Sequence, residues 1–295
     1  MTPQLRAEGL SLGYDHISII DDLDLDLMPG AITVIVGANA SGKSTLLKGL
    51  ARLLKPEAGQ VTLGDRNIAA LPGKKVATVV GLLPQQPIAP DGITVADLVG
   101  RGRYPHQGWF RQWSSTDDEI VADAMAATNT QELAARRLED LSGGQRQRVW
   151  IAMALAQDPE ILLLDEPTTF LDVTHQIEVL DLLLERNREH GTTVVMVLHD
   201  LNLAARYADH LVVMRAGRIV ANGTPAETLT AEIVQHAFDL EARIVSDPVC
   251  GAPMVVPIGR FHGRAPVAQT HPQTAACTTA EPKAAGPTPV LCIAG

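Results

Sequence analysis

Cysteine is scarce in this sequence and absent from most of it. The 295 residues contain three cysteines, Cys250, Cys277 and Cys292, all near the C-terminal end. An odd number of cysteines confined to one end argues against a disulfide framework. No Cys-x-x-Cys pair or His/Cys cluster suggests a metal site of that kind. We therefore expect the chain to fold in a reducing compartment.

Long apolar runs and basic residues are also in short supply. No apolar stretch approaches the roughly 18 residues that a membrane-spanning helix requires, and the N-terminus lacks the features of a signal peptide. Lys and Arg total 24 against 34 Asp and Glu, a formal net charge of −10. This balance disfavours nucleic acid as a partner, because such binding usually rests on Lys and Arg contacts to phosphates. We expect a cytosolic protein whose membrane role, if any, depends on a partner.

Short β-branched runs alternate with helical patterns along most of the chain, which is typical of an α/β fold with a mostly parallel sheet. Buried strands are predicted at 31–36, 161–164 and 193–198, and helices at 43–54 and 175–190, the second stopped by Gly191. The stretch from about residue 93 to 157 has no strong strand and indicates a helical insertion.

From residue 265 the sequence becomes rich in Ala, Pro and Thr. Such a composition buries too little apolar surface to offset the entropy of ordering, so this tail is predicted to be disordered. We divide the chain into one domain at 1–260 and a tail at 261–295. The domain has a core at 1–90 and 158–260 and a helical insertion at about 91–157.

A glycine-rich segment fits the pattern GxxxxGK[ST] and lies between a predicted strand and a predicted helix. Small residues let backbone N–H groups close around phosphates, and the helix N-terminus favours negative charge. We expect Lys43 to reach the β- and γ-phosphates of a nucleotide and Ser44 to bind Mg²⁺. The alternative is a chance glycine-rich turn, which the flanking strand and helix disfavour. The expected phosphate-binding residues are Gly37, Ala38, Asn39, Ala40, Ser41, Gly42, Lys43, Ser44 and Thr45.

Two adjacent carboxylates, Asp165 and Glu166, follow the strand predicted at 161–164. Ligands gather at the carboxyl ends of strands in open α/β sheets. One carboxylate can hold Mg²⁺ while its neighbour polarises the attacking water, so we assign Asp165 to the metal and Glu166 to the water. A solvated strand end is the alternative, and the phosphate loop makes it the weaker one.

A third motif, Leu141–Gln145 with the sequence LSGGQ, precedes a helical stretch at 146–155. A serine and two glycines at a helix start form a second anion-binding end. The predicted loop at 37–45 already binds the phosphates of one nucleotide. The ligand of this second anion-binding helix end must therefore be explained separately. The alternative is a simple N-cap with flexible glycines.

These motifs together resemble those of the ABC ATPases, in the order that family has them. The resemblance implies that Tyr14 stacks on adenine, that Gln85 senses the γ-phosphate and contributes to the metal site, and that His199 is a switch histidine. It also places Asp172 at a dimer seam. Taken singly, each has a plainer interpretation: Tyr14 as an aromatic in a turn, Gln85 and Asp172 as polar loop residues, and His199 as a helix-capping residue.

The resemblance covers roughly residues 5–257 and implies an ABC nucleotide-binding domain. That domain has a RecA-like, mostly parallel core sheet, an antiparallel β region and an inserted helical subdomain. Two copies in that family dimerise head to tail, and each ATP lies between one subunit's phosphate loop and the other's LSGGQ. The residues then expected to act in trans are Ser142, Gly143, Gly144 and Gln145.

The chain has one cassette, no fused membrane domain and no room for a long coiled coil between Lys43 and Leu141. Within the family this favours an importer subunit. We therefore expect a homodimer at the cytoplasmic face of the membrane that binds permease subunits and serves a substrate-binding protein indirectly. The competing hypothesis is a soluble ABC ATPase that acts on ribosomes or nucleic acid.

The segment Val99–Trp109 contains the pattern GRxPH. It resembles a segment of the ATPases that energise uptake of ferric siderophores, with haem and cobalamin importers as related alternatives. The alternative interpretations of this segment are a solvated loop and a small nucleic-acid-binding patch. The stretches at 168–177, 197–206 and 247–257 resemble the same branch.

Overall fold

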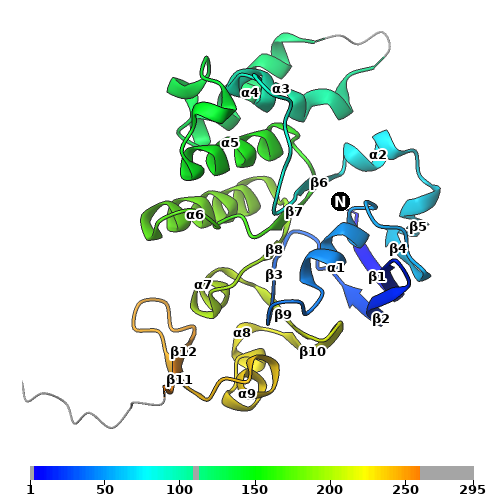
Figure 1. Ribbon diagram of the computed structural model, residues 1–295, viewed down its shortest axis with the longest axis vertical. Coiled ribbons are helices and arrows are strands. Elements are labelled where there is room, and N and C mark those ends of the chain that lie inside the picture. Colours follow the sequence, from blue (N-terminus) through cyan, green and yellow to red (C-terminus); the bar gives the residue numbers. More distant parts are fainter. Residues whose placement is uncertain (1–2, 109–112, 260–295) are drawn as a thin grey trace, which may run out of the picture. The chain divides into compact units, whose positions relative to one another are not determined.

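The computed structural model describes residues 3–108 and 113–259 (Figure 1). Contacts gather residues 1–258 into one compact unit. The tail predicted at 261–295 and Trp109, the last residue of the GRxPH segment, lie outside the described residues. None of the helices in the described ranges is long and apolar enough to span a bilayer.

A six-stranded sheet forms the centre of this unit, in the order β10-β9-β3-β8-β7-β6. All neighbours pair in parallel except β10, which is antiparallel to β9. Strands β3, β7 and β8 are buried along their whole length, and this explains their continuous apolar sequence. The strands span Val80–Leu83 (β6), Ile161–Asp165 (β7), Thr193–Val197 (β8), Ile32–Gly37 (β3), His210–Arg215 (β9) and Arg218–Gly223 (β10).

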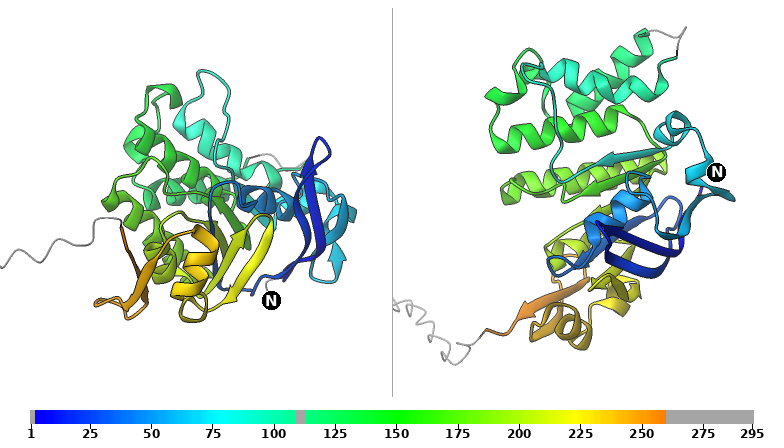
Figure 2. Two further views of the ribbon diagram at one scale, coloured as in Figure 1. Left: turned by 60° about the horizontal axis from the view of Figure 1, so that its bottom comes forward. Right: turned by 45° about the vertical axis from the view of Figure 1, so that its right-hand side comes forward.

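A second sheet is antiparallel and has the order β2-β1-β4-β5. It shares an apolar cluster with helix α1 (Lys43–Leu50) and one face of the parallel sheet, with Leu12, Leu47 and Val195 among its members. Figures 1 and 2 show its strands β1 and β2 in blue beside α1, and β4 and β5 in cyan. Its strands are Leu5–Tyr14 (β1), Ile17–Asp26 (β2), Ala58–Leu63 (β4) and Arg66–Asn67 (β5). The predicted fold class, a mostly parallel core sheet with an antiparallel β region, is confirmed.

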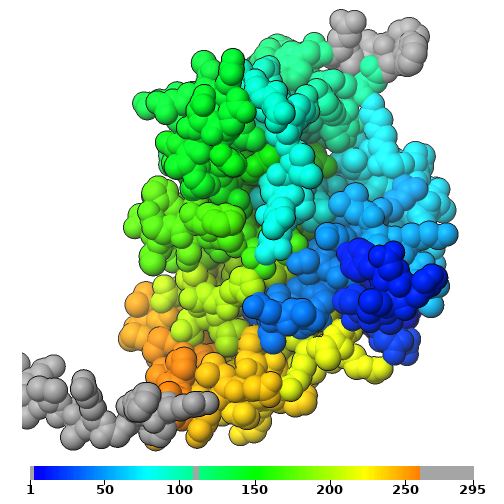
Figure 3. Space-filling model, in the orientation of Figure 1, coloured from blue at the N-terminus to red at the C-terminus, as the bar shows by residue number. Residues whose placement is uncertain are grey.

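The described residues of the stretch 95–156, which are 95–108 and 113–156, form helices and no strand. In Figures 1 and 2 this helical region lies at the end of the unit opposite α9 and β12. Figure 3 shows the chain that follows β6 running over the surface between the helical region (green) and the antiparallel sheet (blue). The helices are Val95–Gly100 (α3), Arg101–His106 (η2), Ser115–Ala127 (α4), Gln131–Leu133 (η3), Leu138–Asp140 (η4) and Gly143–Ala156 (α5).

The remaining elements include α6, which packs its apolar side chains Val179, Leu180 and Leu183 against the parallel sheet. A hairpin of β11 and β12 is held to α7 by the Asn202 amide, which donates to Val255 O (3.3 Å) and accepts from Val255 N (2.7 Å). Arg206 on the same helix pairs with Asp247 and holds the pKa of that carboxyl near 2. These elements are Ile68–Ala70 (η1), Gly73–Ala77 (α2), Val173–His190 (α6), Leu201–Tyr207 (α7), Pro225–Thr228 (α8), Ala231–Phe238 (α9), Ala242–Ser246 (β11) and Pro253–Pro257 (β12).

One predicted boundary is wrong. The apolar spacing predicted a helix over 43–54, but α1 ends at Leu50. Arg52 adopts a left-handed conformation (φ 61), and the N–H groups of Leu53 and Leu54 fold back onto Lys48 O. This closure ends the helix without a glycine, which is the usual signal for such an end.

Replacing Leu163 with alanine is expected to lower the free energy of unfolding by about 2–5 kcal/mol, because this fully buried β7 side chain would leave a cavity in the sheet core. Urea titration measures the loss. Leu53→Ala is the matched control, since Leu53 is 69% exposed and its truncation should change stability by no more than about 0.5 kcal/mol. Equal losses in the two variants would contradict the expectation.

Candidate nucleotide site

The carboxyl ends of three neighbouring strands bring the predicted chemistry together. The loop at 37–44 follows β3, Asp165 and Glu166 lie at the end of β7, and His199 follows β8. In the β7–β8 register Asp165 pairs with Val197, so the residues just beyond both strands lie next to each other. His199 Nε2 accordingly lies 2.6 Å from Glu166 Oε1. Parallel pairing therefore builds this edge of the sheet into a site.

The loop after β3 closes tightly because glycine occupies its narrow points. A Cβ on Gly37 would lie 2.3 Å from Met214 O, so no larger residue fits there. Gly42 has φ 101 and immediately precedes α1. The loop curls around Lys43, whose Nζ donates to Gly37 O and Ala38 O at 2.9 Å each.

Two features of this loop fit an anion. The Ser41 side chain is 3% exposed, and its hydroxyl has no hydrogen-bond partner among the described residues. Lys43 is buried; burial lowers its pKa, while the charges of Glu166 and Asp165 oppose that shift. A buried hydroxyl without a partner and a desolvated ammonium group are both costly unless a ligand satisfies them. A phosphate chain at the N-terminus of α1 would satisfy both.

Asp165 is buried, with 3% of the residue exposed, and its carboxylate accepts a hydrogen bond from Ser44 Oγ at 3.0 Å. Burial raises the pKa of Asp165. Two hard oxygen donors side by side at a phosphate loop fit Mg²⁺, which takes one or two protein ligands and completes its shell with water and phosphate oxygens. Residues 3–108 and 113–259 contain no cluster of three or more His, Cys, Asp or Glu residues that could hold a metal ion by themselves.

Glu166 is fixed by contacts to both carboxylate oxygens. His199 contacts Oε1, and Thr169 Oγ1 donates to Oε2 at 3.1 Å. Glu166 also has φ 54, a left-handed conformation that is uncommon outside glycine and often found at functional sites. A cavity of about 210 Å³ adjoins this carboxylate and His199. The Thr169 contact was not foreseen, because nothing in the sequence distinguishes it from Thr168.

The structure leaves three predicted residues apart from this cluster. Tyr14 ends β1 with 41% of its surface exposed, and Lys48 Nζ lies 5.9 Å from its ring centroid. Gln85 is exposed in the bend after β6, and its side chain makes no hydrogen bond within the described residues. Asp172 is the N-cap of α6, where it accepts from His175 N at 2.9 Å. This hydrogen bond and the His175 side chain hold the pKa of Asp172 below its usual value.

The LSGGQ segment forms a helix cap. Ser142 Oγ accepts from Gln145 N at 3.3 Å, and Gln145 Oε1 accepts from Ser142 N at 3.1 Å, a reciprocal capping box at the start of α5. Ser142 therefore caps α5, and the Gln145 side chain takes part in the same cap. Ser142 and Gly143 remain exposed beside Phe170, which is itself 77% exposed.

A phosphate loop with a buried lysine, a Ser–Asp pair and a carboxylate held by histidine define the class of P-loop nucleoside triphosphatases. The exposed LSGGQ cap supplies a further anion-binding helix end that this site leaves unused. A family model described as ABC transporter matches residues 20–169. The chain belongs to this family and is an ATP-binding, ATP-hydrolysing subunit of the ABC type.

Similar proteins agree with this assignment. The achromobactin transport ATP-binding protein CbrD of Dickeya dadantii is 55% identical over 256 residues, which cover 87% of this chain and 95% of CbrD. The ferric enterobactin transport ATP-binding protein FepC of Escherichia coli is 51% identical, covering 87% of this chain and 95% of FepC. The dimeric structure of the bacterial ABC transporter cassette MJ0796 superposes with a TM-score of 0.69 at 26% identity, covering 75% and 98% of the two chains.

Asp165→Asn is expected to raise the unfolding midpoint of the nucleotide-free protein at pH 7.5. Because burial raises the pKa of Asp165 above 3.8, the ordinary value for aspartate, the folded state binds more protons than the unfolded state between that value and the folded pKa. Stability therefore falls as the pH rises through the folded pKa, and the ionised carboxylate is a cost at neutral pH. Thermal unfolding at several pH values should show a gain for Asp165→Asn that shrinks as the pH falls toward 3.8.

The control is Asp123→Asn, which neutralises an exposed carboxylate on α4 and should leave the midpoint unchanged at every pH. A lower midpoint for Asp165→Asn, or a difference from wild type that does not vary with pH, would show that burial does not dominate at this carboxylate.

Proposed function

We propose that two copies of this protein bind and hydrolyse ATP-Mg²⁺ head to tail, and that this hydrolysis energises import of an iron–siderophore complex through a separate membrane permease. The observation that carries the proposal is the Glu166 carboxylate, held on one oxygen by His199 and on the other by Thr169, beside the Ser44–Asp165 pair. The relatives CbrD and FepC, named for siderophore transport, support the cargo.

Each part of the site has a role in this proposal. The backbone N–H groups of residues 37–45 bind the phosphates, and Lys43 leaves its two carbonyl partners to meet the β- and γ-phosphates. Ser44, Asp165 and Gln85 hold Mg²⁺, which when bound neutralises charge on those phosphates. Tyr14 stacks on adenine. Its exposed ring already attracts a Lys48 cation, as an electron-rich face does.

Glu166 acts as the base in this proposal. Its carboxylate accepts a proton from the attacking water, and His199 and Thr169 fix its orientation before the substrate arrives. A base held on both oxygens loses little entropy when the reaction begins, which is the benefit of positioning. His199 follows β8 and contacts Glu166 at the end of β7. A nucleotide that displaces either side chain would therefore also change the position of the other.

The second subunit completes the site. Ser142, Gly143 and Gly144 lie at an exposed helix N-terminus, and Ser142 still has its hydroxyl proton to donate after accepting from Gln145. Asp172 lies near them at the start of α6 and is proposed to lie at the dimer seam. The exposed apolar side chains of Phe170 and Val173, both 77% exposed, flank this surface and fit burial against a partner. The dimeric relative MJ0796 supports this arrangement.

The proposed location is the cytoplasmic face of the cell membrane, where the dimer is peripheral and binds the permease, with a substrate-binding protein acting on the other side. We retain residues 1–260 as the ATPase domain, with residues 91–157 as its inserted helical subdomain. The GRxPH pattern in this subdomain supports the siderophore branch over the related haem and cobalamin importers.

Glu166→Gln is expected to lower kcat at least about 100-fold, because a positioned general base contributes roughly that much or more. The variant should still bind ATP and should accumulate as an ATP-bound dimer. Steady-state phosphate release measures turnover, and size exclusion with light scattering measures the dimer. Glu119→Gln on the exposed side of α4 is the control and should behave as wild type. If the Glu166→Gln variant turned over at close to the wild-type rate, Glu166 would not be the general base.

Cells that lack this gene should lose uptake of a ⁵⁵Fe-labelled siderophore and regain it with the wild-type gene but not with Lys43→Ala. The reason is that Lys43 supplies the buried cation of the phosphate loop. Haemin and cobalamin uptake measured in the same strains test the related cargoes. Loss of either of these with unchanged iron–siderophore uptake would assign the protein to that cargo and reject the siderophore.

A further inference from the structure

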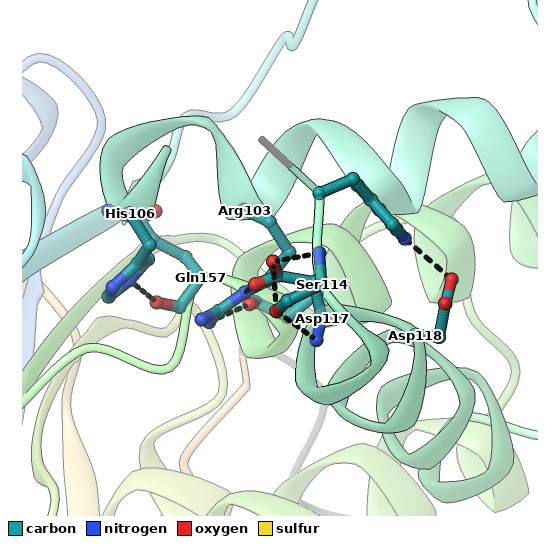
Figure 4. A network of polar contacts seen from close by, with 8 residues as sticks. Arg103, His106, Ser114, Asp117, Asp118 and Gln157 are labelled. Atoms are coloured by element: carbon teal, nitrogen blue, oxygen red, sulfur yellow. Dashed lines mark hydrogen bonds and ion pairs between the residues drawn. The ribbon is translucent and has the colours of Figure 1, made fainter. Parts of the chain in front are cut away.

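The GRxPH segment contacts the C-terminal end of α5, the helix whose N-terminal end carries Ser142. Arg103 Nη1 donates to Ala156 O at 2.9 Å, and His106 Nε2 contacts Gln157 O at 2.7 Å (Figure 4). A carbonyl oxygen only accepts, so Nε2 of His106 carries the hydrogen in this contact. Both side chains therefore cap carbonyl groups that the helix leaves without partners, at the end where its dipole favours cationic groups.

Gly102 lets the two segments approach closely. A Cβ at this position would lie 2.4 Å from Met153 O and 3.0 Å from Gln157 N, which are atoms of the last turn of α5. Backbone atoms cannot move aside as a flexible side chain can, so only glycine fits here. The glycine and the arginine of the pattern thus serve one purpose, direct contact between η2 and the end of α5.

Arg103 is itself held rigidly. Its Nε donates to Asp117 Oδ1 at 2.9 Å, and both side chains are about 95% buried. The other oxygen of Asp117 accepts from Ser114 N and Ser114 Oγ in the capping box of α4. The Arg103 hydrogen bond holds the pKa of Asp117 near 2, so the pair stays charged throughout the physiological range. Figure 4 shows this network between α4 and the end of α5.

Gln157 connects the same helix end to the parallel sheet. Its Nε2 donates to Ala77 O at 2.6 Å and to Val80 O at 3.2 Å, and Val80 is the first residue of β6. The end of α5 is therefore fixed on one side by η2 and on the other by the sheet. A 14-residue helix is rigid over its length of about 21 Å, so fixing one end fixes the other.

We propose that Arg103 and His106 are positioning residues for the LSGGQ segment: by capping the C-terminal end of α5 they set where Ser142 and Gly144 meet the nucleotide of the second subunit. This inference rests on the proposed function, in which that segment acts in trans. The GRxPH segment would then act in the ATPase cycle itself. A segment that only distinguished the transported cargo would not need to cap this helix.

His106→Phe tests the proposal, because it keeps a ring of similar size at a half-buried position and removes the N–H donor. We expect kcat to fall about five-fold, which corresponds to about 1 kcal/mol, the usual contribution of one hydrogen bond. In the Glu166→Gln background, ATP-driven dimerisation should weaken by a similar factor. Binding of a fluorescent ATP analogue to the monomer should stay within two-fold of wild type, since each monomer binds with its own phosphate loop.

His106→Gln retains an N–H donor and should restore much of the lost kcat, and Gln107→Ala, next in the chain, should leave kcat unchanged. The full-length protein is used throughout. Unchanged kcat and dimerisation in His106→Phe would overturn the proposal. A loss of monomer ATP binding equal to the loss of kcat would also overturn it, because the defect would then lie in the fold. If wild type itself lacks turnover, or Glu166→Gln does not dimerise with ATP, the proposed function fails instead.

Discussion

The site depends on the parallel pairing of β3, β7 and β8. Each strand contributes its carboxyl end to the same edge: β3 is followed by the glycine-rich loop, β7 by the Asp165–Glu166 pair and β8 by His199. A shift of one residue in the β7–β8 register would move the Asp165 side chain to the other face of the sheet and separate Glu166 from His199. All three strands are buried along their length, so the apolar packing that fixes their register also fixes the distances between the reacting groups.

This edge of the sheet is assembled at an energetic cost. Lys43 and Asp165 are charged side chains in buried positions, and the pKa of each is shifted toward its neutral form. Ser41 has a buried hydroxyl without a partner, and Glu166 has a left-handed backbone. Each of these features is unfavourable without a ligand, and bound phosphates with a cation would relieve the first three. Part of the binding free energy of a nucleotide would therefore come from removing these unfavourable features of the folded protein.

Sequence alone predicted the parts of the site that depend on local pattern. The glycine-rich loop and the acid pair each follow a continuous apolar strand, and the structure has both strands buried where they were predicted. Features that depend on individual contacts, which no periodicity encodes, were not predicted. Examples are the hydrogen bond from Thr169 to Glu166, only three residues away, and the end of α1 at Arg52, where Leu53 N and Leu54 N fold back onto Lys48 O. Gln85 was predicted from resemblance, and in the nucleotide-free chain it remains an exposed loop residue.

Helix termini explain why the recognised motifs extend beyond the residues that touch nucleotide. Ser142 and Asp172 each cap a helix in the free subunit, and each lies where a second subunit is proposed to dock. A capping oxygen accepts from its own helix, so the anion-binding capacity that remains is the backbone N–H groups and, at Ser142, the hydroxyl proton. Asp172 has no proton to donate, so its carboxylate can stabilise the seam only by accepting. The two capping side chains are therefore not equivalent: the Ser142 hydroxyl can donate to a phosphate, whereas the Asp172 carboxylate can only accept from donors.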